Sequence, residues 1–382
     1  MNPGRRVRDL LLVAVFAVVA GGCATRPVAV PDPALAAKPE ALSVLRSIKS
    51  DPALEERILA LNPERIGEDD FRETLAKAPA PRIVLVHGGI FPVHLAMVSF
   101  GRFLTGMGYP EERIRHPGDR RWSHSPYEDS AQIAGLIAWY YEREGLRPLV
   151  IGHSQGGVEA VKVLYELAGR FTETIPVWNP YTDAAEDRTS IVDPLTGAER
   201  SVVGLRVPYV SVVGAGSAGL LMPNQWSMFQ KLYSVPDTVD EFTGYAIAYD
   251  IFALGPPGVD ENRRFRPNGT AKVRNVILPG TYNHITLPVT QSLADDPQLH
   301  AWISVYTPDA GVSAAPPESS LGLLWAADVW YSVKKHWALE AQRLVCARRA
   351  LTGTAPALAS FAVPVGVNGC PSGGRAGAES AH

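Results

Sequence analysis

Apolar residues occur in this chain in two recurring patterns, short runs that are wholly apolar and longer stretches with helical spacing. The short runs predict buried strands at Ile83 to Val86, Leu149 to Ile151, Val207 to Val213 and Val273 to Leu278. Helical spacing predicts helices over 93–107, 129–144 and a stretch that begins at Val158. Because strands and helices alternate, we expect an α/β protein whose mainly parallel sheet has helices on both faces.

Weaker patterns predict the remaining elements. They are short strands at Glu112 to His116, Ile175 to Trp178 and Tyr245 to Tyr249, a surface hairpin over 190–204, and a C-terminal helix over 321–349. Between Leu220 and Tyr233, apolar residues with helical spacing stand outside the strand–helix alternation. They indicate either a lid over an apolar site or an ordinary core helix.

The 382 residues divide by composition into five segments. Residues 1–23 are a leader, 24–39 form an Ala/Pro/Val-rich tether, and 40–81 are an N-terminal helical cap broken at Asp51-Pro52. Residues 82–354 form the α/β domain, with an insertion at about 181–245. Residues 355–382, rich in Gly, Pro and Ser, form a flexible tail.

The leader has a basic start and then an apolar run from Leu10 to Ala20. This run is too short for a membrane-spanning helix and is typical of a signal peptide. The segment Ala20-Gly21-Gly22-Cys23 resembles the lipobox of bacterial lipoproteins, which implies a lipid on Cys23. Ala24 then favours the outer membrane, facing the periplasm, so we expect a lipid-anchored protein of the cell envelope. A buried or incidental Cys23 is the alternative.

Charge and cysteine content restrict the possible partners. Cleavage of the leader removes three arginines and one aspartate from 36 basic and 39 acidic residues, which leaves a net charge of −5. Nothing here favours nucleic acid as a partner. Cys346 and Cys370 remain in an oxidising compartment, where either a disulfide or two free thiols is possible. Their spacing does not suggest a metal site, and the oligomeric state stays open.

The strongest chemical signal is Gly152-His153-Ser154-Gln155-Gly156, a G-x-S-x-G pattern between a buried strand and a helix. The glycines allow a strained, sharp turn that exposes Ser154 at the carboxyl edge of the sheet. On the following helix, Glu159, Lys162 and Glu166 are expected on the polar face, where they could pair with one another. An ordinary Gly-rich turn with an incidental serine is the alternative.

A serine nucleophile needs a histidine base and a carboxylate that orients the histidine. Among the nine histidines, His284 follows the end of the last predicted strand, which is where such a base would lie. An exposed loop histidine is the alternative for His284. His153, inside the turn, points the wrong way to serve as the base.

Taken together, Val84-Leu85-Val86-His87-Gly88-Gly89, Gly108-Tyr109-Pro110, the serine turn and the late His284 resemble an α/β-hydrolase of the lipase and esterase kind. The resemblance covers about 82–288. It implies an α/β-hydrolase fold and a catalytic serine and histidine. It also implies an oxyanion hole made by the backbone N–H groups of Gly89 (or Ile90) and Gln155.

The acid departs from the family pattern, because Val207 to Val213 runs into Gly214-Ala215-Gly216-Ser217-Ala218 without a carboxylate. Asp250, after the predicted strand ending at Tyr249, is the preferred candidate because it lies between serine and histidine in the required order. Asp237 and Asp240 are alternatives in a loop that looks like a helix start, where aspartate often only caps.

These residues predict a serine hydrolase that cleaves carboxylic esters, lipid or other apolar esters, through an acyl-enzyme on Ser154. No cofactor or metal is expected. A different possibility, motivated by the missing family aspartate, is a catalytically silent hydrolase fold that serves as a binding or scaffold protein in the envelope.

Overall fold

The computed structural model describes residues 38–49, 51–216, 219–248, 250, 253, 264–308, 322–353 and 370. The predicted signal peptide, the predicted lipidation at Cys23, most of the predicted tether and nearly all of the predicted C-terminal tail therefore lie outside the described residues. No helix within the described ranges is both long and apolar enough to span a membrane.

The centre is a five-stranded parallel sheet in the order β1-β2-β7-β9-β11. The strands are β1 Ile83–Val86, β2 Leu149–His153, β7 Val207–Val213, β9 Val239–Ile247 and β11 Lys272–Leu278. Because all strands are parallel, their carboxyl ends meet at one edge of the sheet, where Ser154 and His284 follow β2 and β11. The α/β architecture expected from the sequence is confirmed at this level.

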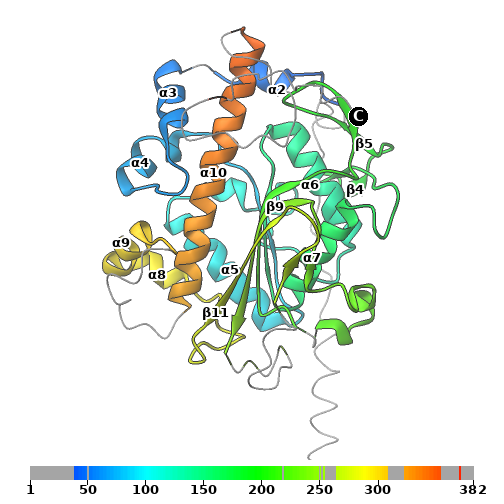
Figure 1. Cartoon of the computed structure of the whole chain (residues 1–382), viewed down its shortest axis with the longest axis vertical. Helices are drawn as coiled ribbons and strands as arrows, with labels where there is room; N and C mark the ends of the chain where they lie inside the picture. The colour runs from blue at the N-terminus through cyan, green and yellow to red at the C-terminus, as the bar shows by residue number, and fades with distance from the viewer. Residues whose placement is uncertain are drawn as a thin grey trace, which may run out of the picture.

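Helices cover both faces of the sheet, as Figure 1 shows for α10 and α7 on opposite sides of the strands. One face packs against α5 Phe91–Gly106 and α10 Leu323–Leu351, and the other against α6 Ser130–Glu144 and α7 Gln155–Leu167. Successive residues of β1 illustrate the cause, since Ile83 and Leu85 belong to one core and Val84 and Val86 to the other.

Smaller elements surround this frame. The short α-helices are α2 Ser43–Ser47, α3 Pro52–Ala60, α4 Glu68–Glu73, α8 Gln291–Asp295 and α9 Pro297–Val305. The 3-10 helices are η2 Leu75–Lys77, η3 Glu111–Arg113, η4 Gly219–Leu221 and η5 Pro223–Met228. Three two-stranded ladders join β3 Trp178–Asn179 to β4 Ala184–Ala185, β5 Ser190–Val192 to β6 Glu199–Ser201, and β8 Ser234–Val235 to β10 Arg266–Pro267.

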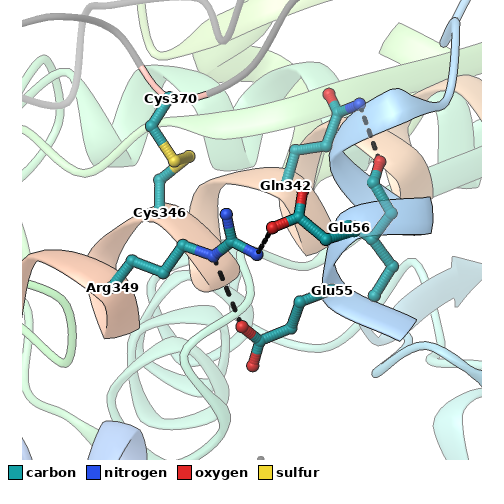
Figure 2. The surroundings of a disulfide bond; sticks show 7 residues. Glu55, Glu56, Gln342, Cys346, Arg349 and Cys370 are labelled. Atoms are coloured by element: carbon teal, nitrogen blue, oxygen red, sulfur yellow. Dashed lines mark hydrogen bonds and ion pairs between the residues drawn. A yellow bond between two sulfur atoms is a disulfide. The ribbon is translucent and has the colours of Figure 1, made fainter. Parts of the chain in front are cut away.

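The N-terminal helices pack on α10 through polar contacts, shown in Figure 2. Arg349 forms ion pairs with Glu55 and Glu56 of α3, and the Gln342 side chain donates to the carbonyls at the end of that helix. Nearby, Cys346 and Cys370 form a disulfide, one of the two alternatives that the sequence left open. The bond joins α10 to a position 24 residues further along the chain.

Several expected elements differ. The strand predicted at Glu112 to His116 is wrong, because the 3-10 helix η3 lies there and Arg115 pairs locally with Glu111. The strand predicted at Ile175 to Trp178 is also wrong, since only Trp178 belongs to a strand, and that strand lies outside the central sheet.

Two further segments were only partly anticipated. Strand β9 begins at Val239, well before the expected Tyr245, and Tyr249 lies outside the described residues. The segment from Leu220 to Tyr233 contains the 3-10 helices η4 and η5 instead of an α-helix. The range 181–245 thus contains β7 and most of β9 as well as η4 and η5.

Candidate active site

Ser154 lies in a sharp turn between β2 and α7. Its backbone has φ 56° and ψ −125°, a conformation that costs about 1–3 kcal/mol in a residue with a side chain. The turn is held because the Ser154 N–H donates to the Val213 carbonyl at 2.8 Å. A Cβ on Gly156 would lie 2.3 Å from the Val86 carbonyl oxygen, so only glycine fits there.

The Ser154 hydroxyl contacts His284, which in turn contacts Asp250. The Ser154 Oγ lies 2.8 Å from His284 Nε2, and His284 Nδ1 lies 2.6 Å from Asp250 Oδ2. The His284 and Asp250 side chains are only 6% and 4% exposed. Because a carboxylate only accepts, Nδ1 carries the proton and Nε2 is free to accept from the serine hydroxyl. The three residues form one hydrogen-bonded chain.

The three aspartate candidates occupy different places. Asp250 follows the carboxyl end of β9, and β9 lies between β7 and β11 in the sheet. Asp237 accepts from the Ala271 N–H at 3.0 Å, and Asp240 forms ion pairs with Arg147 and Arg206 at the start of β9. Asp237 and Asp240 therefore bind groups at the opposite end of β9 from Asp250. Neither begins a helix, contrary to the sequence-based interpretation.

The loop after β1 passes directly beside the serine. A Cβ on Gly88 would lie 3.0 Å from the Ser154 Cβ, so the glycine allows close approach. The partly buried His87 donates its Nδ1–H to the Gly88 carbonyl at 2.7 Å, because a carbonyl only accepts. In a trans peptide the next N–H, that of Gly89, points the opposite way. Within the described residues, the N–H groups of Gly89 and Gln155 make no backbone hydrogen bond.

His153 forms a hydrogen bond with the backbone of His284. Its Nε2–H donates to the His284 backbone carbonyl at 2.8 Å, and its side chain is fully buried. Burial lowers the pKa of His153 to about 3, and that of His87 to about 4, so both imidazoles are neutral near pH 7. As expected from the sequence, His153 does not face the serine hydroxyl. Its contact with the His284 loop was not anticipated, and no local signal in the sequence indicates it.

The charged residues of helix α7 have partners other than those expected from their spacing. Glu159 is 0% exposed and Glu166 is 4% exposed, and both bond to residues outside the helix, while Lys162 donates to the Asn224 carbonyl instead of pairing with them. The helix is covered by α6 on one side and by η4 and η5 on another, so every α7 residue except Lys162 is buried. Gln225 of η5 donates to Glu159, whereas Glu166 accepts from the hydroxyls of Ser130 and Thr172. Long-range packing decides this, and helical spacing alone does not reveal it.

No protein-family model matches the chain, and no curated protein matches it either. In the described part of the chain, no group of three or more His, Cys, Asp or Glu side chains is arranged to hold a metal ion.

Proposed function

We propose that this chain is a serine hydrolase of the α/β-hydrolase type that cleaves carboxylic esters. The observation that carries the proposal is the hydrogen-bonded chain from Ser154 through His284 to Asp250, built on a serine with a strained backbone. A buried, aligned set of hydroxyl, imidazole and carboxylate has the geometry that acyl transfer requires.

In this mechanism, His284 Nε2 takes the proton from Ser154 Oγ as the oxygen attacks the ester carbonyl carbon. Asp250 keeps the imidazole in the required tautomer and stabilises the imidazolium that forms. The N–H groups of Gly89 and Gln155 donate to the developing oxyanion. His284 then protonates the leaving alcohol, and a water molecule activated by the same imidazole releases the acid and restores Ser154.

The surface around the serine favours an apolar ester. Twelve large apolar side chains are exposed in the described part of the chain, and eight of them belong to three segments near Ser154. They are Ile90, Phe91, Leu95, Tyr127, Leu221, Met222, Trp226 and Phe229, here called the apolar rim. The segments contact one another, since the Tyr127 hydroxyl donates to the Gly89 carbonyl and Asn224 donates to that of Pro126.

The lipid anchor at Cys23 and a position in the cell envelope remain part of the proposal. They would hold the enzyme at a membrane, with a lipid or other small ester as substrate. The alternative of a silent scaffold arose from the missing family aspartate. Asp250, which follows β9 instead of β7, contacts His284 and supplies a carboxylate for it, so we propose an active enzyme.

The test is the Ser154→Ala variant, compared with Ser201→Ala, which changes an exposed serine of β6. We expect Ser154→Ala to lower the kcat for p-nitrophenyl butyrate by at least about 1000-fold and Ser201→Ala to leave it unchanged. A fluorophosphonate probe should label the wild-type chain at Ser154, as identified by peptide mass spectrometry. Undiminished turnover by folded Ser154→Ala, or absence of labelling in folded wild type, would refute the proposal.

A further inference from the structure

A buried carboxyl group and a buried amide meet next to the candidate active site. Glu159 lies on α7, one turn after Gln155, and Gln225 lies in η5, and both side chains are 0% exposed. The Gln225 Nε2 donates to Glu159 Oε2 at 2.5 Å. Among the described residues, Glu159 Oε1 and Gln225 Oε1 have no hydrogen-bond partner. Two buried oxygens without donors are costly, so this contact needs an explanation.

The number of protons available for hydrogen bonds decides whether these two oxygens can be satisfied. Gln225 Nε2 has two protons, which it donates to Glu159 Oε2 and to the Pro126 carbonyl at 3.3 Å. An ionised Glu159 has no proton to donate, so both unpartnered oxygens would stay unsatisfied. A neutral Glu159 carries one O–H, which can complete a ring of two hydrogen bonds by donating to Gln225 Oε1.

We propose that Glu159 is a neutral carboxylic acid in the folded protein and that, paired with Gln225, it fastens the segment 219–229 to helix α7 as one wall of the candidate active site. Glu159 is then a positioning residue, because it acts through Gln225 and does not touch the reacting atoms.

The charges around Glu159 are compatible with the neutral form. Burial is the largest effect and raises its pKa to about 7. Lys162 and the hydrogen bond from Gln225 oppose this increase, and Asp129 and Glu166 add to it. The Lys162 ammonium is directed to the neighbouring segment, where it donates to the Asn224 carbonyl at 3.0 Å. The segment 219–229 carries no charged side chain.

The fastened segment connects to the site at two places. It carries Leu221, Met222, Trp226 and Phe229 of the apolar rim. Its Asn224 and Gln225 side chains also donate to the Pro126 carbonyl, and the adjacent Tyr127 hydroxyl donates to the Gly89 carbonyl. Loosening the segment should therefore disturb both the rim and the loop that holds Gly89. This consequence rests on the proposed function, whereas the pairing itself does not.

The direction of the pH dependence follows from the raised pKa. We call the segment closed when Glu159 and Gln225 are paired and open when they are apart. In the closed state the pKa of Glu159 is about 7, above the usual 4.5, so between these pH values the closed state binds one more proton than the open state. Closure is thus most stable below pH 4.5, weakens as the pH rises to 7, and changes no further above pH 7.

The test measures amide hydrogen exchange of residues 219–229 at pH 5 and pH 8, corrected for intrinsic exchange, in the Ser154→Ala background so that no catalysis is needed. With Glu159 present, we expect the segment to open at least about tenfold more often at pH 8. Glu159→Gln preserves both bonds of the ring without a titrating group, so its protection at pH 8 should match that at pH 5. Gln225→Leu should lose protection at both pH values.

Glu166→Gln is the matched control, because Glu166 is a buried carboxyl on the same helix that contacts Ser130 and Thr172 and not η5. It should keep the pH dependence of the segment, reduced only by the small contribution that the Glu166 charge makes to the pKa of Glu159. Protection in Glu159→Gln as low as in Gln225→Leu would overturn the proposal, since it would mean that a carboxylate is required. Protection independent of pH with Glu159 intact would also overturn it. Either result leaves the serine hydrolase proposal to its own test.

Discussion

A single residue, His284, depends on contacts from three parts of the chain. It lies in a loop after β11, and its imidazole is positioned by Asp250, while its backbone carbonyl accepts from His153. Gly214 packs against the ring, where a Cβ would lie 2.7 Å from His284 Cε1. The bonds within the loop are local turn bonds on either side of His284, such as that from the Leu287 N–H to the Asn283 carbonyl, so we infer that the His153 bond helps to keep Nε2 facing the serine.

His153→Phe should therefore impair catalysis without changing residues that face the substrate. It keeps an aromatic ring but removes the donor to the His284 carbonyl, and we expect kcat to fall about tenfold with little change in KM. His153→Gln, which retains an Nε2–H donor at similar reach, should recover most of the activity. Because His153 has a pKa of about 3, neither variant should shift the pH–rate profile near neutrality. Equal activity of the two variants would contradict the role of the hydrogen bond.

Among the elements, α10 is the longest and carries a buried ion pair that anchors the start of β2. Glu340 of α10 accepts from the backbone N–H, Nε and Nη2 of Arg147, whose Nη1 also lies 2.8 Å from Asp240 Oδ2. Burial opposes ionisation of Glu340, but the charges of Arg147 and Arg343 outweigh it and hold the pKa at about 2. The pair joins α10, β9 and the connection between α6 and β2, which is the frame that carries Ser154.

Glu340→Gln should destabilise the fold by about 3 kcal/mol at pH 7, because it leaves the Arg147 charge buried with a weaker partner. The folded pKa of about 2 lies below the usual 4.5, so the stability from this carboxylate is present above pH 4.5 and is lost as the pH falls toward 2. Urea unfolding at pH 7 and pH 3 should therefore show a smaller difference between variant and wild type at pH 3.

The control is Glu56→Gln, which removes an ion pair with Arg349. The Glu56 side chain is 71% exposed. The unfolding midpoint of this variant should match that of wild type at both pH values, since exposed pairs contribute little. If Glu340→Gln were as stable as Glu56→Gln, α10 would not depend on this pair.

For the whole molecule, the apolar rim is the feature that separates the surface near Ser154 from the rest of the described surface. Eight of the twelve exposed large apolar side chains of the described residues belong to the rim, whereas Val305 and Leu351 end the helices α9 and α10. Clustered exposed apolar area marks a binding surface more reliably than isolated residues do. Under the proposed function, the rim would contact the acyl chain of the ester.

Trp226→Ser should accordingly lower kcat/KM for p-nitrophenyl dodecanoate by about fivefold, equivalent to ~1 kcal/mol of lost apolar contact, and leave the acetate ester within about twofold. Leu351→Ser removes an exposed apolar side chain at the end of α10 and should change neither rate. A parallel loss for both esters would show that Trp226 acts on the fold and not on the acyl chain.

The sequence alone determined the elements whose signal is local. Strands β1 and β7 were predicted with their observed bounds, and α6 ends at the expected Glu144. Apolar runs and helical spacing record burial directly, so they suffice for such elements. The turn at Ser154 could also be predicted, because glycine is required around it. A Cβ at these positions would collide with residues close in sequence or with the adjacent β1. The apolar pattern that predicts a strand is absent where a strand begins with polar residues. Strand β9 is an example, because its Asp240 and Glu241 form ion pairs with Arg206 and Lys335.

Only the tertiary structure decided which groups meet across the sheet. Asp250 contacts His284 because β9 and β11 are neighbouring parallel strands whose carboxyl ends lie at one edge, while Asp237 and Asp240 precede or begin β9 at the other end. Strand order is a long-range property that no local pattern encodes. For the same reason, helical spacing suggested that Glu159 could pair with Lys162 on its own helix, whereas η5, more than 60 residues further along the chain, covers Glu159 and makes it a buried partner of Gln225.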